Sequence, residues 1–373
     1  MRRIPLTTVL REWGRIGVIG FGGPPAHIAL LRELVVERRG WLPARDFEDA
    51  NAAAQLLPGP ASTQMSIYCA RRVAGNAGAL AGGLAFILPG LVLTIAIAAV
   101  ALQDDPPEWV QGLGAGAAAA VVAVVAQAGL QLAAASFESR SGAGLARALA
   151  YALLGAAATV TVGAYVVLVL LACGLAELSL RRSGRAAVHA WPIALPLALT
   201  GAAALPALAW TALKVGGLSY GGGFVIVPLM QGDALDHDWL SHAEFANAVA
   251  YGQITPGPVT HTIALIGWGA AGLPGALIAS AIAFAPSFAF VMLGGDRFEA
   301  IRERPGPRAF LDGAGPAAIG AILGAAVLLA TALEEWWQAA VLAAAAALLL
   351  LGRSPLLVLL TGAAAGVAIT TIT

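Results

Sequence analysis

Long apolar stretches constrain the fold of this chain more than any other feature. A helix that crosses the hydrocarbon core of a bilayer needs about 20 apolar residues in succession. Only 11% of the residues are charged, against about 25% in a typical soluble domain, so the chain cannot cover a water-facing surface. The runs are rich in Ala, Leu and Val and lack the alternation of a barrel strand. We therefore predict an all-α integral membrane protein, with candidate spans at Gly78–Leu102, Val110–Ala135, Pro192–Leu208, Pro274–Leu293, Ala317–Leu333 and Pro355–Ile372.

The sequence also repeats itself at a nearly constant spacing. Pro58-Gly59-Pro60 matches Pro256-Gly257-Pro258 at an offset of 198 residues, and Phe21-Gly22-Gly23-Pro24 matches Tyr220-Gly221-Gly222-Gly223 at nearly the same offset. Such self-similarity predicts two homologous halves. We divide the chain into an N-terminal repeat (residues 1–185), a linking transmembrane helix (186–209) and a C-terminal repeat (210–373). Further matches at the offset of 198 pair Trp41 with Trp239, Phe47 with Phe245 and Gln55 with Gln253.

Basic and acidic loops alternate in a way that predicts the topology. Cytoplasmic loops of membrane proteins are enriched in Arg and Lys. The loop before Pro-Gly-Pro is basic in the first half (Arg32–Arg45) and acidic in the second (Asp233–Glu244). The loop after the next long helix reverses this bias, from Asp104-Asp105 to Arg297–Arg308. We therefore predict inverted-topology repeats, a common transporter construction, with the N-terminus in the cytoplasm.

Both motifs are expected to interrupt helices, because proline removes an amide donor and glycine loosens the backbone. Arg45 and Arg71 are both predicted on the cytoplasmic side, although only the Pro-Gly-Pro segment lies between them. That segment would then enter and leave on one side, as a re-entrant hairpin with its tip at Gly59. The Phe21-Gly22-Gly23-Pro24 segment is expected to do the same. A kinked helix that spans the membrane is the alternative.

The predicted hairpin tips have the chemistry to bind an anion. A helix N-terminus exposes unpaired N–H groups and about half a positive charge, and glycine lets the backbone approach an oxyanion closely. We expect backbone amides that follow the motif glycines to hold substrate oxygens. The alternative for each polar side chain is a hydrogen bond to a neighbouring helix. The candidate substrate-binding residues are Gly22, Gly23, His27, Gln55, Gly59, Ser62, Thr63 and Gln64 in the first half and Gly221, Gly222, Gln253, Gly257, Thr260 and His261 in the second, with Ser219, Tyr220 and Thr255 close by.

Three charged residues and one histidine are candidates for electrostatic or coupling roles. Arg15 and Lys214 are equivalent in the repeat, and Lys214 is the only lysine in the chain. The two could attract an anion from opposite sides, although Arg15 also suits an interfacial anchor. Asp312 is either an intramembrane proton carrier or a helix-start carboxylate paired with Arg308. His27 either donates a neutral hydrogen bond or couples the movement of a proton.

Together with His27, Trp41 and Gln64, the two motifs resemble those of the chromate ion transporter family, and the resemblance covers nearly the whole chain. It implies a multi-pass protein of the bacterial inner membrane, with two homologous halves that export chromate from the cytoplasm at the expense of the proton gradient. Sulfate has the same shape and charge, so it is a possible competitor or the true substrate. The second copy has Gly223 where the first has Pro24, and Ile226 where the first has His27. We therefore do not expect the halves to be functionally equivalent.

Several other functions are disfavoured by the composition. A formal net charge of zero argues against a nucleic-acid partner. Two separated cysteines and five histidines provide no haem motif or metal cluster. No ATP-binding motif occurs and no dinucleotide fingerprint is placed after a predicted strand, so we predict no cofactor and no enzyme activity. A passive anion channel and a structural membrane subunit are alternatives to a carrier. Small-residue faces at Gly112/Gly116 and Gly362/Gly366 are consistent with a homodimer.

Overall fold

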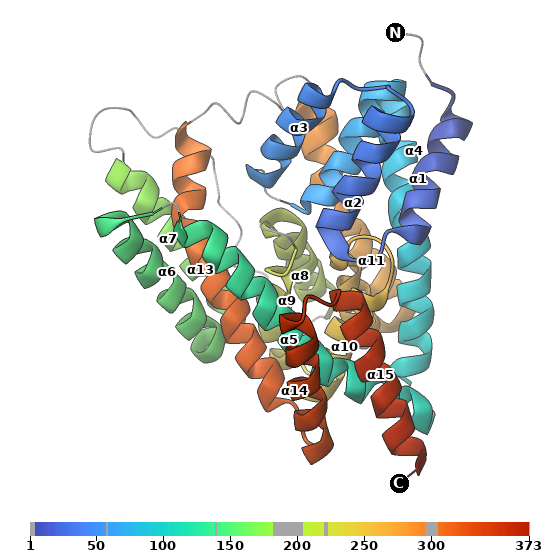
Figure 1. Cartoon of the computed structure of the whole chain (residues 1–373), viewed down its shortest axis with the longest axis vertical. Helices are drawn as coiled ribbons and strands as arrows, with labels where there is room; N and C mark the ends of the chain where they lie inside the picture. The colour runs from blue at the N-terminus through green and yellow to red at the C-terminus, as the bar shows by residue number, and fades with distance from the viewer. Residues whose placement is uncertain are drawn as a thin grey trace.

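The computed structural model of the chain describes residues 4–56, 59–103, 105–138, 140–181, 204–219, 223–294 and 305–372. Every regular element in these ranges is a helix (Figure 1), which confirms the all-α prediction. Most of the predicted span Pro192–Leu208 lies outside the described residues, whereas Gly142–Arg181 is a span that the sequence analysis did not single out. The segments long and apolar enough to cross a membrane are Ala61–Ala101, Glu108–Glu138, Gly142–Arg181, Val259–Gly294, Gly306–Thr331 and Pro355–Ile372.

The helices of the two halves follow the same order along the chain. Helices α3 and α10, for example, both have 13 residues and are related by the offset of 198. The first half contains α1 (Leu6–Ile19), α2 (Gly23–Arg32) with a π-helical extension η1 (Glu33–Arg38), α3 (Ala44–Leu56), α4 (Ala61–Ala101), α5 (Glu108–Glu138), α6 (Gly142–Val162), the 3₁₀ turn η2 (Gly163–Tyr165) and α7 (Val166–Arg181). The second contains α8 (Ala204–Leu218), α9 (Ile226–Asp236), α10 (His242–Ile254), the 3₁₀ turn η3 (Val259–His261), α11 (Thr262–Gly294), α13 (Pro305–Thr331), α14 (Trp336–Leu350) and α15 (Pro355–Ile372).

Helices end and restart at the glycine and proline motifs. In the first motif α1 ends at Ile19 and α2 begins at Gly23, after Gly22 with a φ of +99°. Gly59 and Gly257, between the helices that flank each Pro-Gly-Pro, have φ of +117° and +92°. These left-handed values are open to glycine and strained for other residues. The helices that lead into the motifs have 13 to 15 residues, too few to cross a bilayer alone.

The long helices α4 and α11 bend at equivalent glycines. Gly75 and Gly272 have φ of +72° and +61°, and Pro89 and Pro286 follow inside the same helices. Each bend separates a short first arm, which starts at the Pro-Gly-Pro motif, from an apolar second arm. The second arms correspond to two of the spans predicted from the sequence.

Close packing of α1 on α4 is repeated by α8 on α11. A Cβ atom added at Gly17 would lie 2.6 Å from the carbonyl oxygen of Phe86. At the equivalent place, Gly216 faces the carbonyl oxygen of Ala283. The absence of a side chain therefore lets each half pack its first helix directly on the backbone of its long helix.

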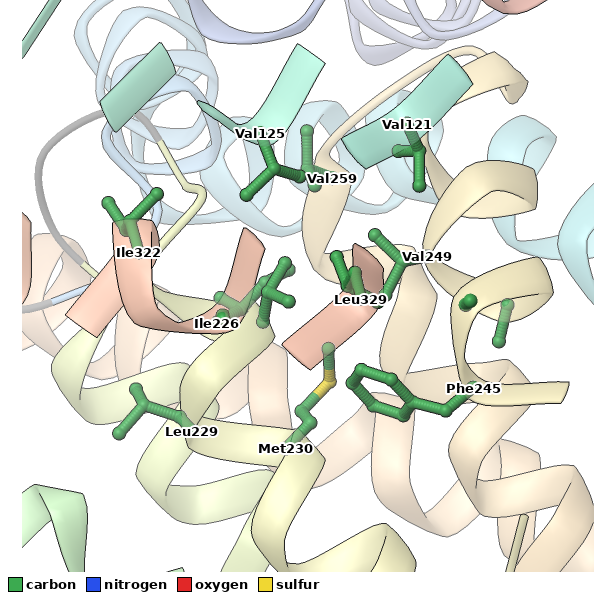
Figure 2. Packing of buried hydrophobic residues seen from close by; sticks show 14 of the residues in the cluster. Val121, Val125, Ile226, Leu229, Met230, Phe245, Val249, Val259, Ile322 and Leu329 are labelled. Carbon is green, nitrogen blue, oxygen red and sulfur yellow. The ribbon is translucent and has the colours of Figure 1, made fainter. Parts of the chain in front are cut away.

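The hydrophobic core is shared between the two halves. Figure 2 shows Val121 and Val125 of α5 in the same cluster as Ile226 of α9 and Phe245 of α10. Helix α13 packs on both α6 and α7, and α4 packs on α11. Because the apolar surfaces of one half are covered by helices of the other, the halves are interleaved.

The glycine faces of α5 and α15 pack against each other within the chain. Gly112 meets the backbone of Gly366, and Gly116 meets that of Gly362. In the sequence these faces are consistent with a homodimer. Their surfaces are already occupied inside one molecule, so they are not available to a second copy.

The α5–α15 contact predicts a specific effect of adding one methyl group. In Gly116→Ala the new Cβ would collide with the carbonyl oxygen of Gly362, and overpacking of this kind costs about 1–3 kcal/mol. We expect a lower thermal unfolding midpoint for the purified protein in detergent. Gly144→Ala is the matched control, because this helical glycine in α6 has open space around its Cβ position. Equal midpoints for the two variants would contradict this packing.

Candidate functional site

The carbonyl oxygen of Gly20 joins a motif of the first half to a motif of the second. It accepts a hydrogen bond from the backbone N–H of Gly257, with a nitrogen–oxygen distance of 2.8 Å. The Nε2 atom of His27 lies 2.8 Å from the same oxygen. Because a carbonyl oxygen can only accept, the contact assigns the proton of this ring to Nε2. The turn after α1 and the second Pro-Gly-Pro turn are therefore fixed to each other.

A third motif reaches the same place. A Cβ atom at Gly23 would lie 3.9 Å from Cγ2 of Val259, which follows the second Pro-Gly-Pro. A Cβ atom at Gly223 would lie 3.7 Å from the Cβ of Val259 and 4.0 Å from Cγ of Pro24. The glycine motifs of both halves thus lie in van der Waals contact around Val259.

The first Pro-Gly-Pro turn packs on the long helix of the opposite half. A Cβ atom at Gly59 would lie 2.6 Å from Nε2 of Gln64, 3.3 Å from the carbonyl oxygen of Gly216 and 3.3 Å from Oγ of Ser287. The second turn mirrors this placement, because a Cβ at Gly257 would lie 3.8 Å from the carbonyl oxygen of Phe86 in α4. Each turn therefore faces a helix of the other half.

Polar side chains around these turns are fully buried. Ser62, Thr63 and Gln64 on α4 and Thr260 and His261 after the second turn are at most 1% exposed. Several buried polar atoms in this region have no well-aligned hydrogen-bond partner among the described residues, although the carbonyls of Ile87 and Pro256 lie beside the His261 ring. They are Nδ1 of His27, Oγ1 of Thr63, Oγ of Ser219, Nε2 of Gln253, both ring nitrogens of His261 and Oγ of Ser287.

Unpaired buried polar atoms are costly, at about 1–3 kcal/mol each, and such groups call for a functional explanation. The gathered hydroxyl, amide and imidazole groups include hydrogen-bond donors suited to an oxyanion. In addition, no side chain caps the N-terminus of α2 or α4, where first-turn N–H groups lack intrahelical partners. The arrangement therefore brings neutral hydrogen-bond donors of both halves to the motif junction.

Some predicted site residues do not join this cluster as expected. The amide of Gly257 is occupied by Gly20, and Gly23, Gly59 and Gly257 are each followed by a proline without an N–H. Amide donors must therefore come from later residues of each first turn. Tyr220, Gly221, Gly222 and the side chain of Gln55 lie outside the described residues.

The charged candidates have environments that the repeat did not indicate. Arg15 is exposed and lines a small cavity of about 80 Å³ with Glu12, Glu33 and Arg38. Lys214 is buried, with its Nζ 2.5 Å from Oδ2 of Asp233. The two equivalent residues therefore differ sharply in burial.

Asp312 is paired with arginines of the first half. Its carboxylate oxygens lie 3.3 Å from Arg140 and 2.8 Å from Arg181. Glu177 joins the same cluster by binding Arg147 and Arg181. This differs from the expected alternative partner Arg308, because the fold brings the start of α13 to the ends of α5 and α7.

Comparison with known proteins gives the family. The model of the chromate transporter family matches residues 7–178 and 206–367. The chain belongs to this family. No solved structure matches it.

Relatives of this chromate transporter family member cover most of its length. A chromate transport protein of Cupriavidus metallidurans is 32% identical over 324 residues, which are 85% of this chain and 80% of the relative. A probable chromate transport protein of Synechococcus elongatus is 30% identical over 84% of this chain and 82% of its own length. A chromate transport protein of Pseudomonas aeruginosa is 30% identical over 83% of this chain and 77% of its own length. Membership and the apolar helices agree with a multi-pass bacterial membrane protein, and favour a transporter over an enzyme.

Two residues of this transporter were missed in the sequence. Ser287 lies inside an apolar run, but it directly follows Pro286, the repeat equivalent of Pro89, and that proline was the available signal. The sequence analysis places Asp233 at the start of the acidic loop Asp233–Glu244. The structure instead places it, 4% exposed, in α9.

The backbone of the second Pro-Gly-Pro turn predicts a stability difference. In Gly257→Ala a non-glycine residue must adopt a positive φ, which costs about 1–2 kcal/mol, and its Cβ would lie 2.8 Å from Cε1 of His261. Gly352→Ala shares the positive φ but has nothing within 4 Å. We expect the thermal unfolding midpoint of the transporter in detergent to fall more for Gly257→Ala. Equal shifts would show that the turn is not tightly packed.

Proposed function

We propose that this protein is a secondary transporter of a tetrahedral oxyanion, and that it exports chromate across the inner membrane. The observation that carries the proposal is the junction of motifs from both halves at the Gly20–Gly257 hydrogen bond, surrounded by buried polar atoms without well-aligned partners. Neutral donors suit this task, because hydroxyl, amide and imidazole groups can donate hydrogen bonds to the oxygens of an oxyanion.

The choice of chromate rests on the names of the relatives, three of which are chromate or probable chromate transport proteins. Sulfate has the same charge and tetrahedral shape, so it is the expected analogue or competitor. Hydrogen bonds to oxygens do not distinguish the two ions strongly. Discrimination between the two ions therefore has to come from their difference in size, through the space that the packing of the turns leaves.

We further propose that the two halves are inverted repeats, with the N-terminus in the cytoplasm and the four motifs as tips of re-entrant hairpins. The matched segments 7–178 and 206–367 fall within the proposed repeats 1–185 and 210–373, on either side of the proposed linking helix 186–209. In Figure 1, α3 lies near the end of the molecule that carries the N-terminus, whereas its equivalent α10 lies in the opposite half of the view. This placement supports inversion.

In this arrangement a hairpin of one half faces a long helix of the other, so movement of the hairpins against these helices would open the site to one side of the membrane at a time. The short arms end at Gly75 and Gly272, where a change of backbone angle moves an arm without disturbing the long span beyond it. Such alternation distinguishes a carrier from a passive channel.

Uptake of labelled chromate and sulfate into proteoliposomes tests the function. We expect saturable uptake that is accelerated by unlabelled anion on the opposite side, because a carrier returns faster when loaded. Uptake without saturation or acceleration would indicate a channel. If neither anion moves, the transport assignment is wrong.

Ser287 provides a sharp test of the site. Hydrogen bonds to charged groups are worth about 1.5–3 kcal/mol, so we expect Ser287→Ala to raise the half-saturating oxyanion concentration roughly 10- to 100-fold, and Gln64→Ala to weaken transport as well. Ser280→Ala is the matched control. Ser280 is buried on the same helix, but its hydroxyl donates to the carbonyl of Ala276 at 2.7 Å. Equal effects of the two serine variants would remove Ser287 from the site.

Labelling of introduced cysteines tests the inversion. In a background without Cys69 and Cys173, Arg45→Cys and Glu244→Cys place thiols at the starts of α3 and α10. We expect a membrane-impermeant reagent added to intact cells to label the second variant and not the first. Labelling of both would place the two loops on one side and contradict inverted repeats.

A further inference from the structure

A buried ion pair links α8 to α9 in the second half. Lys214 is 3% exposed and Asp233 is 4% exposed, and Nζ of Lys214 lies 2.5 Å from Oδ2 of Asp233. The hydroxyl of Thr211 donates to the same carboxylate oxygen. The ring of Trp210 lies 5.8 Å from the ammonium group. The carboxylate is therefore itself an oxyanion held by an ammonium and a hydroxyl.

The described surroundings of this pair contain few other ionisable groups. On its own helix Asp236 and His237 follow, and Nδ1 of His237 lies 3.0 Å from the backbone oxygen of Asp233. Helix α11 has no ionisable residue, and Tyr165 of η2 is 60% exposed. In α10, His242 and Glu244 lie at the N-terminus, where Glu244 completes the cap of Ser241. The charges of α6, α7 and α13 are those in the ion-pair cluster Arg147, Glu177, Arg181, Asp312, together with Arg308 at the start of α13. The other titratable side chains of these helices are buried: the hydroxyl of Tyr251 in α10 donates to the carbonyl of Val110, that of Tyr151 in α6 donates to Glu177, and Cys173 lies in α7.

Stability alone does not account for such a pair. Replacing a buried ion pair by apolar residues of similar volume is often neutral or stabilising, whereas removing one partner is costly. Ionisable residues at membrane depth are rare, and they mark ion and proton pathways in transporters. We therefore expect that Lys214 and Asp233 separate during transport and that one of them then binds another partner.

We infer that Asp233 is a proton-binding site whose protonation releases Lys214 to the transported oxyanion, an inference that rests on the proposed function. The carboxylate takes one proton and becomes a neutral acid, while Lys214 keeps its ammonium charge. Binding a dianion beside the intact, neutral pair leaves a net charge of −2 in the protein interior. Binding it after protonation of Asp233 leaves −1, which is much less unfavourable in a low-dielectric medium.

The position of Lys214 fits this role. It precedes Ser219 by five residues, or about 7.5 Å along a helix, and the hydroxyl of Ser219 is fully buried without a partner among the described residues. Between them, the carbonyl of Gly216 lies close to Gly59. The ammonium lies beside Trp210 and shares the Asp233 carboxylate with Thr211, on the N-terminal side of Lys214. To approach the motif junction, the flexible lysine side chain has to swing toward the C-terminal end of α8.

The direction of coupling follows from reciprocity. If protonation of Asp233 favours anion binding, anion binding favours protonation to the same extent, so one proton and one dianion travel together. Their combined charge is −1. An inside-negative membrane potential drives that charge outward, so in this scheme the potential powers export, in place of the inward flow of protons that the family resemblance implies.

Infrared difference spectroscopy of the protein reconstituted in lipid tests the inference. We expect the stretching band of a protonated carboxyl group to appear on acidification, and on adding chromate or sulfate at constant pH. The band should be absent from Asp233→Asn and retained in Asp46→Asn, which alters an exposed pair with Arg72. Because Asp233→Asn leaves Lys214 unpaired, the double variant Asp233→Asn/Lys214→Gln, with a neutral amide pair, is the second test protein.

Binding measurements complete the test. Sulfate stays a dianion across the range used, so its affinity reports protonation of the protein alone. We expect the wild-type affinity for sulfate to rise up to about tenfold for each unit of decrease in pH, as for one linked proton, and the double variant to show no such rise. A wild-type slope in the double variant, or an anion-induced band that survives in Asp233→Asn, would overturn the inference. An Asp233 band that follows pH in a protein that binds neither anion would support the proton site and overturn the proposed function instead.

Discussion

The structure depends on one constraint, that backbone polar groups inside a bilayer must find partners within the protein. Four motifs interrupt the helices of this chain, and each interruption frees amides and carbonyls. The Gly20 carbonyl shows how the cost is reduced, because it accepts from an amide of the other half and lies beside a buried histidine. Interrupted segments are stable here because they pack against one another and not against lipid. The same packing brings together the polar groups that we propose bind the substrate.

Small residues allow these segments to pack closely. Gly17 and Gly216 let the first helix of each half lie directly on a long helix, and positive φ at Gly59 and Gly257 turns the chain tightly enough to place both Pro-Gly-Pro segments against the opposite half. A larger side chain at Gly17 or Gly216 would separate backbones that are now in contact, and at Gly59 or Gly257 it would collide with the side chain of Gln64 or His261. Both the packing of the helices and the proposed site therefore require that these positions carry no side chain.

The sequence predicts the helical class and most of the spans, because an apolar run in a bilayer has few alternatives to a helix. The breaks at Gly22, Gly59 and Gly257 follow from the local chemistry of glycine and proline. The partners could not be predicted in this way. The amide of Gly257 bonds to Gly20, Lys214 pairs with Asp233 and Asp312 pairs with Arg140 and Arg181. Each of these contacts depends on which distant helices become neighbours, and a repeat detected in one dimension does not contain that information.

The packing of α5 against α15 has a consequence for biosynthesis. The groove formed by Gly112 and Gly116 is filled by a helix that begins at Pro355, more than two hundred residues later in the order of translation. While the ribosome makes the intervening segments, α5 is already in the membrane with its groove covered only by lipid. The first half therefore cannot complete its own packing until the second has been inserted, so the two halves mature as one cooperative unit and not in succession.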